Sequence, residues 1–276
     1  CPIFAATNDT TGNPHGPLSE WNVAAVISMS IVFAGDYRFS PNSGSTSSDH
    51  SPWCKVFNGD LSKWNVANVQ DVFGMFSHAY AFNGDLSAWD LTSVTKTEKM
   101  FYHATGFNGD ISTWNFASLT NTKSMFEEAS SFNNDISQWK MRTVNNVAHM
   151  FKGATAFNAD VSQWDVSNMN QMLEMFFSAT SFNRDVSFWN IAAVYTSNNI
   201  GNMFNGAASF NFKTALDVVW EERKPDYYPG TAMFDGTCST SVLCGICGQR
   251  GPTTNSAVTC SPSVQPAAAL SSTPCD

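Results

Sequence analysis

A tryptophan recurs at every twenty-fifth position through the middle of this 276-residue chain, and no other feature limits the possible folds as strongly. The members of this column are Trp64, Trp89, Trp114, Trp139, Trp164 and Trp189. Each stands in the same frame, Phe-Asn-x-Asp-(Leu/Ile/Val)-Ser-x-Trp, which a segment containing Met-Phe-x-x-Ala follows. A fixed period of this length is typical of a solenoid, in which successive units stack and bury a shared core.

The end copies depart from this frame, as terminal units of a solenoid must in order to present a capped face to water. Trp21 marks a degenerate first copy, and a Ser/Gly/Pro-rich insertion at about 40–56 separates it from Phe57. Near the other end Met203 comes three residues late, and Lys213 replaces the expected Asp. We therefore divide the chain into an N-terminal cap (1–56), the solenoid (57–212), a cysteine-containing cap (213–250) and a Ser/Thr/Pro-rich tail (251–276).

The spacing of apolar residues within one copy predicts a short strand followed by a short helix. Leu61, Trp64 and Val66 stand at i, i+3 and i+5, as in a leucine-rich repeat, and Trp64 and Val66 would share one strand face. Spacings of three and four then indicate a helical stripe, with Asn68 as a plausible N-cap (Ser167 or Asn168 in a later copy); the stripe comprises Val69, Val72, Met75, Phe76 and Ala79. The predicted fold class is α/β, a right-handed leucine-rich-repeat-like solenoid of strand–helix units with disulfide-stapled caps.

The frame resembles that of the BspA-type leucine-rich repeat family of surface proteins, and specifically the DUF285 repeat. The stretch from Met150 to Met169 follows that pattern almost position for position, and the resemblance covers about 17–212. It implies a surface or secreted protein of a bacterium, protist or alga that is associated with adhesion. It implies no catalytic residues.

Charge and cysteine content indicate the cellular compartment of the protein and the classes of partner that it can bind. The net charge of −9 argues against a nucleic-acid groove, and no apolar run reaches the roughly 18–20 residues of a membrane span. The chain begins at Cys1 rather than Met, which we interpret as a mature secreted protein, and Asn8 lies in a glycosylation sequon. All seven cysteines avoid the regular repeats, which favours disulfides in an oxidising compartment. They are Cys1, Cys54, Cys238, Cys244, Cys247, Cys260 and Cys275.

We expect Cys1 to pair with Cys54, which leaves one odd thiol among the rest, although connectivity cannot be deduced from sequence. Cys244 and Cys247 form a Cys-x-x-Cys pair, for which a disulfide-stapled cap is favoured over a metal knuckle because no second ligand pair is visible.

The residues on either side of each Trp are the predicted ligand-binding site. The column before Trp varies while the frame does not, which is how a solenoid encodes a binding surface on a fixed scaffold; a merely solvated face is the alternative. The candidates are Lys63, Asn65, Asp90, Thr113, Asn115, Gln138, Lys140, Gln163, Asp165 and Phe188.

Two further columns carry metal-ligand chemistry. Six aspartates at one register would repel one another, so each needs either backbone donors at its turn or calcium between coils. They are Asp60, Asp85, Asp110, Asp135, Asp160 and Asp185. His78, His103 and Glu128 share another register and could suit zinc, although Gly153 and Ser178 continue that column and favour plain surface variation. No cofactor is expected, apart from calcium as an option.

These features predict an extracellular or cell-surface module that binds a protein or glycan and acts in adhesion. The alternative is a structural subunit of an extracellular filament or coat that self-assembles through its ends. No nucleophile–base constellation, phosphate loop or HExxH motif is present, so we do not expect an enzyme.

Overall fold

The computed structural model describes residues 18–35 and 52–211, which lie within the first of two compact units of the chain, residues 1–237. The described residues contain three short regular elements. They are η1 (Leu18–Glu20), α1 (Pro52–Lys55) and η2 (Ser197–Asn199). The predicted C-terminal cap and tail fall outside the described residues.

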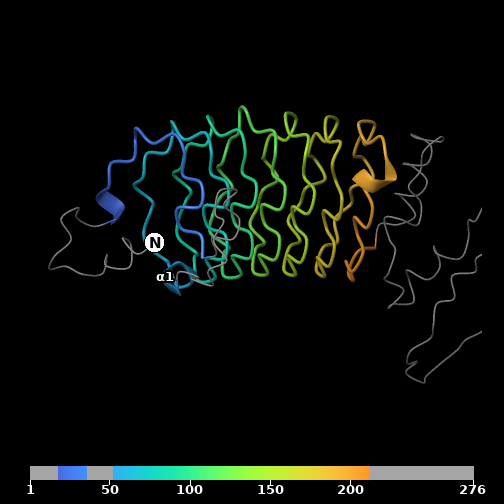
Figure 1. Cartoon of the computed structure of the whole chain (residues 1–276). Helices are drawn as coiled ribbons and strands as arrows, with labels where there is room; N and C mark the ends of the chain where they lie inside the picture. The colour runs from blue at the N-terminus through green and yellow to red at the C-terminus, as the bar shows by residue number, and fades with distance from the viewer. Residues whose placement is uncertain (1–17, 36–51, 212–276) are drawn as a thin grey trace, which may run out of the picture. The chain divides into compact units, whose positions relative to one another are not determined.

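Each 25-residue copy forms one coil of consecutive turns, and the coils stack side by side in chain order (Figure 1). Isolated parallel bridges at one register link consecutive coils, running from Ser28 through Asp71, Lys96, Asn121, Asn146 and Gln171. The period of the sequence is therefore the period of the stack.

The ladder segment, defined as residues seven to fifteen after each Trp from Trp64 to Trp164, holds neighbouring coils together through its backbone. In residues 121–129 every second N–H donates to the next coil: Ser124 to Ala148 (2.9 Å), Phe126 to Met150 (2.9 Å) and Glu128 to Lys152 (2.7 Å). The N–H groups between them close turns within the coil: Met125 to Thr122 (3.0 Å), Glu127 to Ser124 (3.3 Å) and Ala129 to Phe126 (3.1 Å). From Ser124 to Ala129 each N–H thus has a partner, as buried backbone requires.

The predicted helix is wrong, and these turns are the reason. The apolar stripe is real, but its spacing of three comes from turns that close from residue i+3 to residue i, which place side chains on one side much as a helix does. Ser124 and Glu128 have φ of 56° and 60°, so a right-handed helix cannot pass through them. The predicted N-caps are wrong with it. The Asn68 and Asn168 amides instead donate to the carbonyls of Ala24 and Arg142 in the preceding coil (both 2.8 Å).

The predicted strand at the tryptophan is wrong as well, so residues 18–35 and 52–211 do not form an α/β solenoid of strand–helix units. The Trp64 N–H closes a turn onto the Leu61 carbonyl (3.1 Å), and Val69 closes another onto Val66 (2.9 Å). The coils are joined here by side chains. The Trp89 Nε1–H donates to the Leu61 carbonyl of the preceding coil at 3.0 Å, and the same bond recurs at each tryptophan from Trp64 to Trp189.

The core of the stack is a double column of phenylalanine rings. Phe126 lies 3.9 Å from Phe132 in its own coil, measured between ring centroids, and 5.7 Å from Phe151 in the next coil. The rings of this column from Phe76 to Phe182 are fully buried, and the methionine that precedes each Met-Phe phenylalanine is buried beside them. Burial contributes about 1.5–3 kcal/mol for each such side chain, so this column is the main favourable term that holds the coils together.

Candidate functional site

The Trp-flanking face, defined as the residues immediately before and after each Trp, lies on the surface of the stack. All ten predicted binding residues are exposed, and Phe188 has 74% of its surface accessible. The intervening tryptophans are buried, with 1–4% of their surface exposed from Trp64 to Trp189. The structure therefore brings the predicted residues together as two parallel rows on either side of a buried tryptophan column.

The row after Trp serves the backbone in most coils. The side-chain oxygen of Asn65 accepts the Ala67 N–H (3.2 Å), and Asp165 accepts both the N–H (3.1 Å) and the hydroxyl (2.6 Å) of Ser167. Asp90 makes the same two bonds with Thr92 (3.0 and 2.7 Å). An Asn or Asp that binds the backbone two residues on stabilises a turn, which explains why these residue types recur after Trp.

The row before Trp has no common structural task. It reads Lys63, Ala88, Thr113, Gln138, Gln163 and Phe188, and all six are exposed. Gln138 and Gln163 each donate to the hydroxyl of the preceding serine (3.2 and 3.3 Å), whereas Thr113 donates to the Ser87 carbonyl of the preceding coil (2.8 Å). Chemistry that differs from coil to coil, at a position the scaffold does not restrict, is what a binding surface needs.

The aspartate column caps turns. One carboxylate oxygen of Asp60, and of each of its five equivalents, accepts the N–H of the serine two residues on, at 2.9 Å. The hydroxyl and then the N–H of that serine lower the pKa of Asp60 and Asp85 below its ordinary value. For Asp135 and Asp160 the N–H lowers the pKa more than the hydroxyl does. These bonds keep the carboxylates ionised despite their neighbours.

The described part of the chain holds no metal centre with three protein ligands. There, no three His, Cys, Asp or Glu side chains are grouped so that they could hold a metal ion. The calcium option on the aspartate column thus finds no clustered ligands, and each aspartate has a sufficient role in its turn.

The ladder segments carry a second row of chemically varied residues, whose conformation the sequence analysis missed. The backbone is left-handed at ten and at fourteen residues after each Trp from Trp64 to Trp164, for example at Lys99 (φ 58°), His103 (φ 56°) and Glu174 (φ 52°). Non-glycine residues rarely adopt this conformation, although histidine does so more readily than most. The sequence signal for this left-handed conformation was the occurrence of glycines among the non-glycine residues of these columns, such as Gly74 and Gly153.

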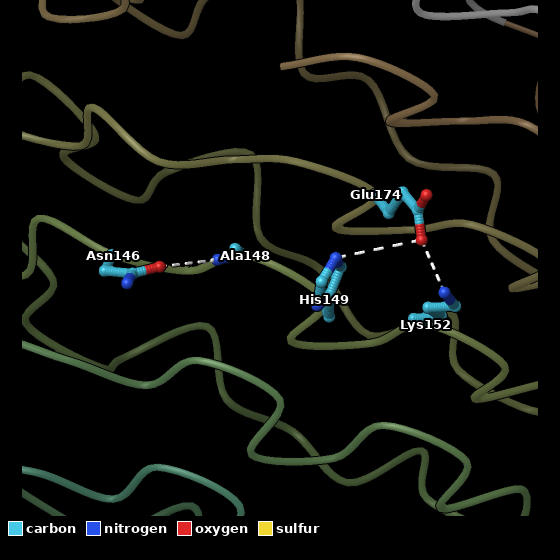
Figure 2. Close-up of polar contacts among 5 residues, drawn as sticks. All are labelled: Asn146, Ala148, His149, Lys152 and Glu174. Carbon is cyan, nitrogen blue, oxygen red and sulfur yellow. Dashed lines mark hydrogen bonds and ion pairs between the residues drawn. The ribbon is translucent and has the colours of Figure 1, made fainter. Parts of the chain in front are cut away.

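A polar cluster bridges two coils within these segments (Figure 2). Glu174 Oε2 accepts from Lys152 Nζ and lies 3.8 Å from His149 Nε2, while Asn146 Oδ1 accepts the Ala148 N–H at 3.0 Å. Burial lowers the pKa of His149, against the opposing effect of Glu127 and Glu174, so its imidazole is neutral at neutral pH. The cluster therefore acts as an inter-coil ion pair beside a neutral histidine.

The remaining predictions fall mostly outside the described residues. Cys54 is fully buried and disulfide-bonded, but the other six cysteines lie outside, so its pairing with Cys1 stays a prediction. The sequon at Asn8 lies outside as well. Over residues 18–35 and 52–211, the chain has no helix of the length and apolar character that a membrane span requires.

Comparison with known proteins gives one match. The family described as "Mycoplasma protein of unknown function, DUF285" matches residues 5–51, 52–139 and 110–218. No curated protein and no solved structure matches the chain.

Proposed function

The chain belongs to the DUF285 family, and from that premise we propose that it is an extracellular or cell-surface binding module of the adhesion type. The observation that carries the proposal is the row before Trp, which is exposed in six consecutive coils and differs in chemistry from coil to coil. The row includes a cation (Lys63), a hydroxyl (Thr113), two amides (Gln138 and Gln163) and an aromatic ring (Phe188).

The division of labour within each coil supports this surface over others. The frame residues are committed to the scaffold: phenylalanines fill the core, tryptophans and asparagines bond an adjacent coil, and aspartates stabilise turns. Selection for a ligand can act only on positions that the scaffold leaves open, and the row before Trp is the open row nearest the tryptophan column. A protein or glycan lying along the stack would contact several coils at once.

The resemblance of the frame to BspA-type surface proteins, together with cysteines that avoid the repeats, supports a location outside the cell. The filament or coat subunit is the competing proposal, and it predicts end-to-end polymers of the full chain in particle images. A binding module predicts single particles.

A binding experiment tests the proposed surface. The labelled full chain is screened on arrayed glycans and arrayed extracellular proteins, and each hit is titrated. The triple variant Thr113→Ala, Gln138→Ala and Gln163→Ala should weaken a genuine hit at least about tenfold, which corresponds to about 1.4 kcal/mol. Its melting temperature should fall only slightly, because exposed substitutions seldom exceed about 0.5 kcal/mol each and only Thr113→Ala among the three removes a hydrogen bond between coils, which is itself exposed.

The matched control replaces Ser131, Asn145 and Ser181 by alanine. These residues are exposed in the same coils but do not flank a tryptophan. Equal weakening by both triple variants, or by neither, would show that the Trp-flanking face is not the binding surface.

A further inference from the structure

His78 and His103 form a stacked pair on the ladder segments of two consecutive coils. Both stand fourteen residues after a tryptophan. Their ring centroids lie 4.9 Å apart and the rings are inclined by 9°. Two imidazoles are thus held at the spacing of neighbouring strands in a sheet, about 4.8 Å.

The backbone fixes this spacing. The His78 N–H donates to the Tyr102 carbonyl (2.7 Å), and the His103 N–H donates to the Glu127 carbonyl (2.8 Å). Both residues have a left-handed conformation, with φ of 59° and 56°. The ladder therefore places the two side chains in register whatever their chemistry, and what the sequence adds is a histidine in each of two adjacent coils.

Ser77 orients the first ring. Its hydroxyl oxygen lies 2.9 Å from His78 Nδ1, and only 2% of the residue is exposed. A histidine that binds a metal through one ring nitrogen usually donates the hydrogen on the other to a neighbouring oxygen. The Ser77 hydroxyl can accept from Nδ1–H of His78, and in that tautomer the lone pair of Nε2 is the one that binds a metal ion.

We propose that His78 and His103 together bind one divalent transition-metal ion, with water completing its coordination. Imidazole nitrogen suits zinc, copper and nickel, and zinc accepts low coordination numbers without a strict geometric preference. Because Zn–N bonds are about 2.0–2.1 Å, the rings must tilt from parallel toward a common ion. This site is separate from the Trp-flanking face and does not depend on the proposed binding function.

The next acid in the column does not join the pair. A side-chain carbon placed on Gly153 would lie 2.4 Å from Glu128 Oε1, so the Glu128 carboxylate occupies the space above that glycine, toward the following coil. This agrees with the absence of a three-residue metal cluster from the described residues and makes the site a two-imidazole one.

Calorimetric titration of the full chain with ZnCl₂ tests the proposal. Asparagine accepts the left-handed conformation, so His78→Asn and His103→Asn remove an imidazole while keeping the backbone. Each should weaken zinc binding at least about tenfold, by analogy with the loss seen when only a supporting residue is removed. His149→Asn is the matched control: it replaces a left-handed histidine elsewhere on the ladder segments and should leave zinc affinity unchanged.

Electron paramagnetic resonance of bound Cu²⁺ gives a second readout, with coupling to two nitrogens expected in the unmodified chain and to fewer in either pair variant. His103→Gly replaces His103→Asn if the latter fails to fold, since Gly153 occupies the same register. The proposal is overturned if the unmodified chain binds no zinc, if the pair variants bind as tightly as it does, or if His149→Asn weakens binding equally.

Discussion

Two of the inter-coil connections of each repeat, one around the Trp and one along the ladder segment, work by different means, and the difference explains which residues vary. Around each Trp the coils are joined by side chains, namely the indole N–H and the amide of the turn asparagine. Along the ladder segment they are joined by backbone groups. A connection made by a side chain requires one residue type at that position. A connection made by the backbone tolerates many, and the ladder register of His78 accordingly continues with Glu128, Gly153 and Ser178.

The largest effect is expected in the core on which both connections depend. Phe126→Ala removes a ring that stacks on Phe101, Phe132 and Phe151, and should lower the free energy of unfolding by about 3–5 kcal/mol. Urea denaturation measures the loss. The same substitution at exposed Phe188 is the control and should cost less than about 1 kcal/mol. Similar losses at both positions would refute the buried double column.

A smaller loss is expected when the indole bond alone is removed. Trp139→Phe keeps an aromatic ring but removes the Nε1–H that donates to the Ile111 carbonyl (3.1 Å), so a buried acceptor loses its partner. The cost should be about 1–3 kcal/mol in urea denaturation. Glu127→Ala, in the backbone-joined ladder segment, should change stability by less than about 0.5 kcal/mol. A larger effect at Glu127 than at Trp139 would reverse the comparison.

Two asparagines, one whose side chain joins the coils and one whose backbone joins them, allow the two kinds of connection to be compared with a single residue type. Asn133 Oδ1 accepts the Asn158 N–H of the next coil (2.7 Å), whereas Asn145 meets its neighbours through backbone groups. Asn133→Ala should therefore cost about 1 kcal/mol, and Asn145→Ala much less. Thermal unfolding of the two variants measures this difference in stability. Equal shifts in melting temperature would show that the asparagine column does not join the coils.

Acidification should produce the smallest effect, because the aspartates concerned are largely exposed. Serine lowers the pKa of Asp60, Asp85, Asp135 and Asp160 in the folded chain, so their contribution to stability is present above the ordinary aspartate pKa of about 3.9. It is lost as the pH falls through the lowered values. The melting temperature should therefore decline below about pH 4. Asp160→Asn should reduce that decline; an unchanged pH profile would contradict the turn-capping role.

The period, the core and the exposed rows could be predicted from the sequence, because they depend only on which residues repeat. The local conformation could not. Turns that close at i+3 and a helix both place Val69, Val72, Met75 and Phe76 on one side, so apolar spacing does not distinguish them. The strand prediction failed similarly, since an i, i+2 pair such as Trp64 and Val66 also fits a coil in which side chains supply the bonds. That Asp90 and Asp165 accept backbone N–H groups could not be predicted either, because it depends on the turns of the coil.

The central claim is that every second backbone N–H of a ladder segment donates to a carbonyl of the next coil, and that the segment contains no helix. Trans-hydrogen-bond scalar couplings in a deuterated, isotope-labelled sample detect each donor–acceptor pair directly. The structure predicts couplings from the amide nitrogens of Phe126 and Glu128 to the carbonyl carbons of Met150 and Lys152 in the next coil. Couplings from Phe126 to Thr122 and from Glu128 to Ser124, each four residues back as in an α-helix, would contradict it.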